Sequence, residues 1–260
     1  MIQKNKFSEN EIILKLKSLK INNIDCLFVA NDLGKIGLIE GQNKRYLLNC
    51  IYSNLISLNP NITIVVPTAN FNLLNSEKVF DLNNTPSYRM GAFSEYIRNL
   101  RGAKRSFHPF WSLTAIGPLA GKIVNNISNH AYDKNSSFSK LFEIKDSFFL
   151  SIGQHPRFML SIIHHFEHIY KVPYRFTKEF KINCLINSKL STEIFKLDVL
   201  KEEFRYSKRS FNKKIFENFE KKNNFYETSL GKGMMYYFNL KDFYLTTCKL
   251  FEKDVNCWWK

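Results

Sequence analysis

Short apolar runs rich in β-branched and aromatic residues alternate with longer amphipathic stretches through the first two thirds of the chain. Short apolar runs ended by glycine, proline or polar residues are typical of buried strands. Stretches with apolar residues at a spacing of about 3.6 are typical of helices. Strands separated by helices usually join in one sheet that is covered on both faces. The alternation therefore predicts an α/β fold with a central β-sheet and helices on both faces.

The individual elements follow from these runs. The expected strands cover Cys26–Ala30, Thr63–Val66, Ser112–Ile116 and Phe148–Ile152. The expected helices cover Tyr46–Leu58, Gly91–Leu100, Pro118–Ile127 and Arg157–Tyr170. After Pro173 the pattern changes, because Tyr174–Ile186 alternates like an extended strand and Glu202–Glu220 is helix-compatible. We expect antiparallel strands at one edge, so that the central sheet is mixed.

The length of 260 residues suits one large domain with a well-buried core. No linker rich in Gly, Pro or Ser and no internal repeat divides the chain, so we expect a single domain over residues 1–260. The sequence does not fix the oligomeric state, and a homo-oligomer stays open.

The chain is basic, with 38 Lys and Arg residues against 23 Asp and Glu residues and a net charge of +15. A basic surface can bind nucleic acid, but the basic and aromatic signatures of such modules are missing from the sequence. The chain is also rich in Lys, Asn, Ile and Phe together, as an AT-rich coding bias would make it. We therefore expect no nucleic-acid polymer as partner, and favour a phosphorylated small molecule or cofactor.

The five cysteines are scattered without a Cys-x-x-Cys pair, which suits neither a disulfide framework nor a zinc site. A reducing cytoplasm is the compartment that fits this usage. The N-terminal segment has no apolar core of signal-peptide length, and no apolar run approaches the roughly 20 residues that cross a bilayer. We therefore expect a cytoplasmic protein that does not insert into a membrane.

The densest group of titratable side chains is Ser161-Ile-Ile-His164-His165-Phe-Glu167-His168. On a helix, residues three and four apart share a face, so Ser161, His164 and His168 align and Glu167 lies beside His164. A carboxylate that holds a neutral histidine in one tautomer is the arrangement of a general base. The segment therefore predicts a His164/Glu167 general base.

Other interpretations of this segment stay open. His164 and His168 could chelate a divalent metal and serve a metal hydrolase, but the sequence is not His-Glu-x-x-His and offers no obvious third ligand. We therefore expect no metal. The histidines could also be ordinary core or surface residues. Three of the six histidines lie within five positions, which weakens that structural interpretation.

A second polar group, Arg105-Ser106-Phe107-His108-Pro109-Phe110-Trp111-Ser112, precedes an expected strand. Its guanidinium, hydroxyls, imidazole and aromatic rings suit a phosphate and a planar ring. An ordinary loop whose arginine caps backbone carbonyls has the same composition. Composition alone does not separate the two interpretations.

The order and spacing of several motifs carry more information than either group. They run Val66-Pro67-Thr68, Phe80-Asp81, Gly91-x-Phe93-x-Glu95-x-x-Arg98, Arg105-Ser106-x-His108-Pro109-x-x-Ser112, Ala115-x-Gly117-x-x-Ala120 and Ser161-x-x-His164-x-x-Glu167. In this order they resemble the aminoglycoside 3-N-acetyltransferase family over roughly residues 15–255. The Arg-Ser-x-His-Pro-x-x-Ser string is the most specific of them.

The resemblance implies an α/β acyltransferase that moves an acyl group directly from acetyl-CoA or another acyl-CoA to a primary amine. By resemblance His164 is the general base and Glu167 orients it. The residues expected at the coenzyme A site are Asn31, Asp32, Arg105, Ser106, His108 and Ser112. The residues expected on the acceptor side are Asp81, Glu95 and Ser161.

The chain departs from the family at several places, and two of them affect the expected ligand contacts. Where the family has His-Ser-Ser after its first strand, this chain has Ala30-Asn31-Asp32, and Trp111 stands where the family has a second histidine. Such a member could have changed its acyl donor or acceptor. An inactive relative that only binds ligands is a further alternative.

The net charge of +15 bears on the acceptor. Aminoglycosides are polycations, and a positive protein attracts anions instead. We therefore expect an amino sugar linked to a nucleotide diphosphate as the acceptor. An aminoglycoside antibiotic is the alternative.

Overall fold

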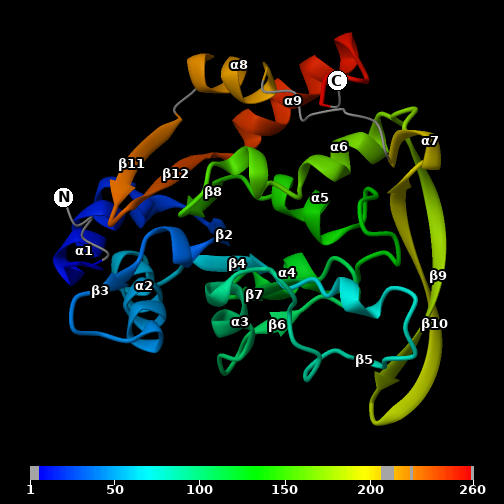
Figure 1. The fold of residues 1–260 in the computed structure, drawn as a ribbon, viewed down its shortest axis with the longest axis horizontal. Helices are drawn as coiled ribbons and strands as arrows, with labels where there is room; N and C mark the ends of the chain where they lie inside the picture. The colour runs from blue at the N-terminus through cyan, green and yellow to red at the C-terminus, as the bar shows by residue number, and fades with distance from the viewer. Residues whose placement is uncertain (1–5, 206–213, 223–224, 259–260) are drawn as a thin grey trace.

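The computed structural model describes residues 6–205, 214–222 and 225–258, and at its centre lies a mixed sheet (Figure 1). Among these residues the sheet has seven strands in the order β11 (Tyr226–Leu230), β12 (Gly233–Asn239), β8 (Ser147–Ile152), β2 (Cys26–Asn31), β4 (Thr63–Pro67), β7 (Leu113–Ile116) and β6 (Lys104–Arg105). β8, β2 and β4 run parallel, and the flanking pairs are antiparallel. The predicted mixed sheet is confirmed, and each of its four expected strands lies within one residue of its observed bounds.

Both faces of this sheet are buried. Leu27 and Val29 of β2 belong to one apolar core, while Phe28 and Ala30 belong to the other. The first core includes residues of α1 (Glu9–Ser18), α2 (Lys44–Leu58) and α3 (Ala92–Arg98). The second includes residues of α4 (Ala120–Val124), α5 (Ser137–Phe142), α6 (Ile163–Ile169), α8 (Lys214–Lys222) and α9 (Leu240–Lys253). The predicted helices on both faces are therefore confirmed.

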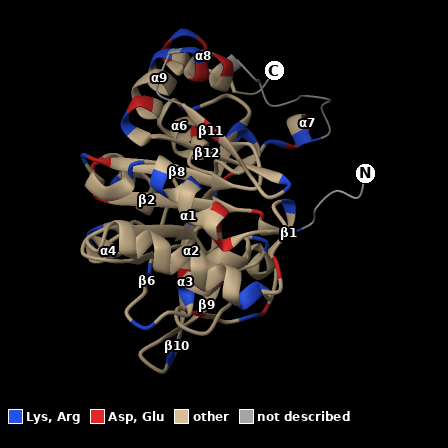
Figure 2. Ribbon diagram, turned by 90° about the vertical axis from the view of Figure 1, so that its left-hand side faces the viewer, with Lys and Arg blue, Asp and Glu red and all other residues tan. Residues whose placement is uncertain are grey.

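Charged residues avoid the centre of this layered structure. Figure 2 shows β2 and β8 without charged residues, and shows Lys, Arg, Asp and Glu on outer elements such as α8. Among the residues that the structure describes, no helix is long and apolar enough to cross a membrane.

A long two-stranded ribbon lies outside the central sheet and runs along one side of the molecule in Figure 1. β9 (Arg175–Ile186) and β10 (Lys189–Leu200) pair along their full length, and short β5 (Phe80–Asp81) joins β9 to make a separate sheet. Asn187 and Ser188 between them have φ of 49° and 64°, as a tight hairpin turn requires. The expectation that Tyr174–Ile186 lies at an edge of the central sheet was therefore wrong. Alternation identifies a strand but not the sheet that it joins.

The helical predictions were less accurate at their ends. The expected helix Arg157–Tyr170 is divided into a short 3₁₀ turn, Pro156–Phe158, and α6, so Ser161 precedes the helix of His164. The expected helix Pro118–Ile127 shortens to α4. Glu202–Glu220 contains α7 (Glu202–Arg205) and part of α8, and residues 206–213 between them lie outside the described residues. A short pair, β1 (Lys6–Phe7) and β3 (Leu38–Ile39), completes the fold.

Candidate active site

A cavity of about 880 Å³ opens where the parallel strands end. Its wall includes Asn31 at the end of β2, Pro67 at the end of β4, and Gln154 just after β8. In open α/β sheets, ligands bind outside the carboxyl ends of the parallel strands. The wall is completed by His164 of α6 and by Trp258 near the C-terminus. The topology therefore places a large binding site beside the predicted base.

His164 and Glu167 form a closely spaced pair on α6. Nδ1 of His164 lies 2.5 Å from Oε2 of Glu167, one turn later on the helix. The His164 side chain is 20% exposed and lines the cavity, whereas the Glu167 side chain is fully buried behind it. An ionised carboxylate accepts a hydrogen bond from Nδ1–H, which leaves the lone pair on Nε2. The pair thus has the geometry of an oriented general base.

Glu167 is kept ionised by its neighbours. Burial alone would raise the pKa of this carboxyl, but the charge and hydrogen bond of His164, the Arg175 guanidinium and the Tyr174 hydroxyl together lower its pKa below the ordinary value. Tyr174 donates to Oε1 at 2.9 Å, and the Nε of Arg175 lies 2.7 Å from Oε2. Both neighbours come from the segment that enters the ribbon.

Three further predicted residues line the cavity, namely Asn31, Asp32 and Ser161. The Asn31 side chain is held by the protein itself, because its Oδ1 accepts from the Phe93 amide at 3.1 Å and its Nδ2 donates to Ser94 at 3.2 Å. Asn31 thereby caps the start of α3. Gly91 permits this contact, since it has a φ of +90° and a Cβ there would lie 2.3 Å from Asn31 Oδ1.

The structure does not bring Arg105, Ser106, His108 and Ser112 to this cavity. The Arg105 guanidinium donates to the carbonyl oxygens of Thr85 and Thr68, both at 2.5 Å, and to the Ser112 hydroxyl at 2.9 Å. Ser106 accepts from the amide of Leu113, and Ser112 donates to the Thr68 carbonyl. His108 is buried, which lowers its pKa to about 3. These polar atoms join the loop of residues 105–112 to its neighbours.

Asp81 and Glu95 also lie away from the cavity lining. Asp81 accepts from the amides of Asn83 and Asn84 and so closes its own turn. Glu95 pairs with Arg98 at 2.6 Å and accepts from Ser87. Although burial alone would raise the pKa of Glu95, these donors lower it to about 2. Both carboxylates are already occupied by protein donors.

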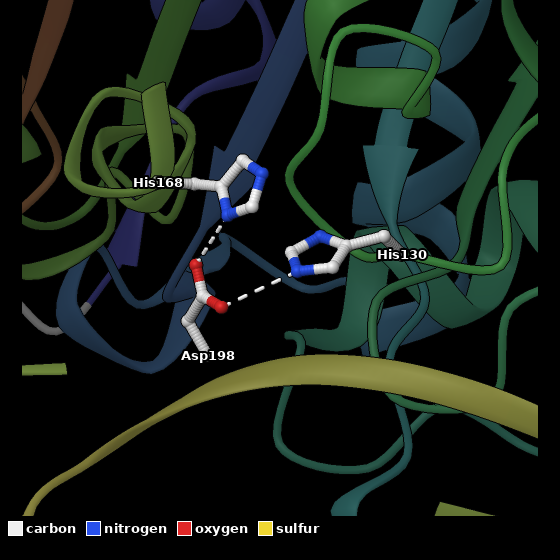
Figure 3. Close-up of side chains that lie close together, drawn as sticks. All are labelled: His130, His168 and Asp198. Atoms are coloured by element: carbon white, nitrogen blue, oxygen red, sulfur yellow. Dashed lines mark hydrogen bonds and ion pairs between the residues drawn. The ribbon is translucent and has the colours of Figure 1, made fainter. Parts of the chain in front are cut away.

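His168, the second histidine of the alternative in which His164 and His168 chelate a metal, belongs to a different cluster. His168 Nδ1 lies 2.7 Å from Asp198 Oδ2, and His130 Nε2 lies 3.3 Å from Asp198 Oδ1 (Figure 3). The candidate ligand atoms of these three residues lie within 4.8 Å of one another. However, His130 Nδ1 accepts the backbone N–H of Tyr132 at 3.1 Å, so neutral His130 carries its proton on Nε2. A protonated Nε2 is a hydrogen-bond donor to Asp198 and cannot ligate a metal, which favours a hydrogen-bonded clamp.

The cavity contains three cations that the sequence patterns did not single out. Among the described lining residues, the Lys, Arg, Asp and Glu side chains are Lys44, Arg89, Arg157 and Asp32. The cations therefore outnumber the one carboxylate. They come from separate segments of the chain, so no spacing rule could have grouped them. Trp111 also lines the cavity, with its ring 6.4 Å from the ring of His164.

Comparisons with known proteins agree with this architecture. YokD from Bacillus subtilis matches with a TM-score of 0.77 and 22% identity, over 96% of this chain and 94% of YokD. AAC-VIa bound to sisomicin matches with a TM-score of 0.79 and 18% identity, over 95% and 98% of the two chains. AAC-IIIb in a binary complex with CoASH matches with a TM-score of 0.76 and 17% identity, over 95% and 97%. At these identities the likeness establishes the fold.

No curated protein is similar enough in sequence to count as a match. The model of the aminoglycoside 3-N-acetyltransferase family matches residues 29–252, which is most of the chain. The predicted resemblance and the predicted enzyme class, an acyltransferase, are thereby confirmed. The chain belongs to the aminoglycoside 3-N-acetyltransferase family.

Proposed function

We propose that the chain transfers an acyl group from an acyl-CoA to a primary amine, with His164 as general base and Glu167 as the residue that orients it. The observation that carries this proposal is the buried Glu167 carboxylate 2.5 Å from Nδ1 of a histidine that lines a large cavity. The pair needs no metal, because the carboxylate fixes the tautomer and stabilises the imidazolium.

The reaction requires one proton transfer in each direction. An alkylammonium has a pKa near 10, so the amine must lose a proton before its lone pair attacks the thioester carbonyl. The ammonium gives that proton to solvent, and Nε2 of His164 then accepts a second proton from the amine nitrogen as the N–C bond forms. When the C–S bond breaks, the coenzyme A thiolate leaves and takes up a proton from the imidazolium. A positioned base of this kind contributes about 10²–10⁴-fold in rate.

The donor is the acyl-CoA expected from the family, and a structural neighbour is described with CoASH. Lys44, Arg89 and Arg157 on the cavity wall supply positive charge for its phosphates. The oxyanion that develops on the thioester needs hydrogen-bond donors. The Asp32 amide already donates to the Ile152 carbonyl at 2.8 Å, so it has no free hydrogen for the oxyanion. We therefore assign this role to the loop amides that follow it, beginning at Leu33.

The acceptor in this proposal is an anionic amino sugar, such as one linked to a nucleotide diphosphate. The net charge of +15 favours an anion over a polycation. The second candidate is an aminoglycoside antibiotic, which the family description and the neighbour bound to sisomicin favour. Steady-state rates with a nucleotide-linked amino sugar and with a kanamycin-type antibiotic distinguish the two. Faster turnover of the antibiotic would refute the anionic acceptor.

The base is tested by thiol release from acetyl-CoA in the wild type and in His164→Ala. We expect a loss of about 10²–10⁴-fold in the variant. His155→Ala is the matched control, because His155 also pairs with a carboxylate, Glu220 at 2.9 Å, but is not among the cavity-lining residues. Equal rates in the wild type and His164→Ala would remove His164 from this role. No thiol release with any amine would favour the inactive relative.

A further inference from the structure

A guanidinium shares the carboxylate oxygen that orients His164. Oε2 of Glu167 lies 2.5 Å from Nδ1 of His164 and 2.7 Å from Nε of Arg175. The Arg175 side chain is 12% exposed, and it reaches Glu167 from the first residue of β9. Its Nε–H is not directed along a hydrogen bond to this oxygen, so the contact acts through charge. The imidazole of His164 and the guanidinium of Arg175 therefore share one oxygen of the Glu167 carboxylate.

This arrangement changes how strongly Glu167 can act on the imidazole. A buried carboxylate beside a histidine favours the imidazolium, and an imidazolium cannot accept the proton of an incoming amine. A positive charge on the same oxygen offsets that effect. We propose that Arg175 is a positioning residue of the active site, which balances the charge of Glu167 and so keeps the imidazole of His164 neutral and available at physiological pH. This inference rests on the proposed role of His164 as general base.

The ring neighbours of His164 are neutral aromatic side chains, and the cavity wall adds a net positive charge. The Tyr132 ring lies 5.4 Å from the His164 ring, and burial raises the pKa of its phenol, so it stays uncharged. Tyr174 from the ribbon segment is also held neutral, since burial and the Glu167 charge raise its pKa. Trp111 carries no charge. On the cavity wall Asp32 is accompanied by three cations, Lys44, Arg89 and Arg157, and their excess positive charge also disfavours the imidazolium.

The ribbon holds Arg175 in place through a second set of contacts. Arg175 donates from Nη1 to the backbone carbonyl of Asp198 at 3.2 Å. The Asp198 carboxylate in turn receives His168 of α6 at 2.7 Å and Thr177 of β9 at 2.7 Å. The helix that carries the base and the ribbon that carries the guanidinium are therefore joined at two adjacent points. A fixed guanidinium has a constant effect on the imidazole.

A pH series tests the proposal. We measure thiol release against pH for the wild type, Arg175→Met and Arg175→Lys, and follow the His164 ring by NMR in the enzyme without substrates. The ring is assigned by its loss in His164→Gln. In Arg175→Met the acid limb of the rate profile and the ring's titration midpoint move up by about one pH unit or more, because the Glu167 charge is no longer balanced. In Arg175→Lys, which keeps the positive charge, both values return most of the way to those of the wild type.

The control is Arg98→Met, which makes the same change in another buried arginine paired with a carboxylate, Glu95. It leaves the midpoint in place. If Arg175→Met does not fold, Tyr174→Phe removes a neutral donor from the same carboxylate and shifts the midpoint in the same direction by less. An unchanged or lowered midpoint in the variant that folds overturns the proposal, whatever its maximal rate. Full activity in His164→Gln would instead refute the proposed base, while the NMR midpoint in the other variants still reports on Arg175.

Discussion

Replacing Glu167 by glutamine removes the charge from the pair and keeps its shape. Among the described contacts of Glu167, Oε2 lies within 2.7 Å of both His164 Nδ1 and Arg175 Nε, whereas Oε1 accepts from the Tyr174 hydroxyl. The amide oxygen of Gln therefore takes the Oε2 position, and its NH₂ group faces Tyr174, whose oxygen can accept. His164 keeps its Nδ1–H tautomer. What Glu167→Gln loses is the negative charge that stabilises the imidazolium.

The structure sets the size and sign of three effects. Turnover falls by about 10²-fold or more, since the base loses its stabilising charge. The acid limb of the rate profile moves down, because Arg175 then repels an imidazolium without compensation. Stability falls by about 3 kcal/mol, because a guanidinium with a 12% exposed side chain loses its partner. In a chain of this size that lowers the melting temperature by about 6–12 °C.

Thiol release against pH and thermal melts measure these effects. Because the folded-state pKa of Glu167 is lowered, its ionised form stabilises the protein above the ordinary Glu range, and this contribution is lost as pH falls through the folded value. The gap in melting temperature between wild type and Glu167→Gln should therefore close in acid. Turnover within a few-fold of wild type, or an acid limb that moves up, would refute the reasoning.

Three further substitutions test other parts of the structure. Asp198→Asn should cost about 1–3 kcal/mol at pH 7 in denaturant titrations, and less in acid, because burial alone would raise the Asp198 pKa but its donors lower it. Gly91→Ala should lower the melting temperature more than Gly102→Ala, since both have φ near +90° but only a Cβ at Gly91 would meet Asn31. Arg105→Met should lower the melting temperature, because the carbonyl groups of Thr85 and Thr68 lose a buried donor. It should leave KM for acetyl-CoA within about twofold, because Arg105 does not line the cavity. A KM raised tenfold would return Arg105 to the coenzyme A site.

Strands of the central sheet were predictable because burial on both faces leaves a continuous apolar run. Cys26–Ala30 and Thr63–Val66 are such runs, and both strands are observed with one further residue. The ribbon was harder to place. Its residues alternate as a strand should, but the choice of partner depends on contacts with α6 and β5 that no local pattern records.

The close approach of His164 and Glu167 was predictable for a similar local reason. Glu167 follows His164 by three residues, so one helical turn brings them together without any long-range contact. Arg175 is equally close to Glu167, but it reaches the carboxylate from a strand beyond Pro173. The role of the polar loop of residues 105–112, in contrast, was not predictable from a local pattern. Its composition fits both a ligand and backbone carbonyls, and only the fold places Arg105 on the carbonyls.

The two departures from the family pattern differ in their consequences. The side chain of Asn31 is held at the start of α3, although Ala30, Asn31 and Asp32 all line the cavity. Trp111 also lines the cavity, with its ring packed against Phe71 at 5.0 Å and Phe138 at 5.8 Å. The Trp111 ring lies beside His164, where it can pack against the apolar face of a sugar ring, and its π face also attracts cations. Trp111 therefore shapes the part of the cavity next to His164 for either candidate acceptor.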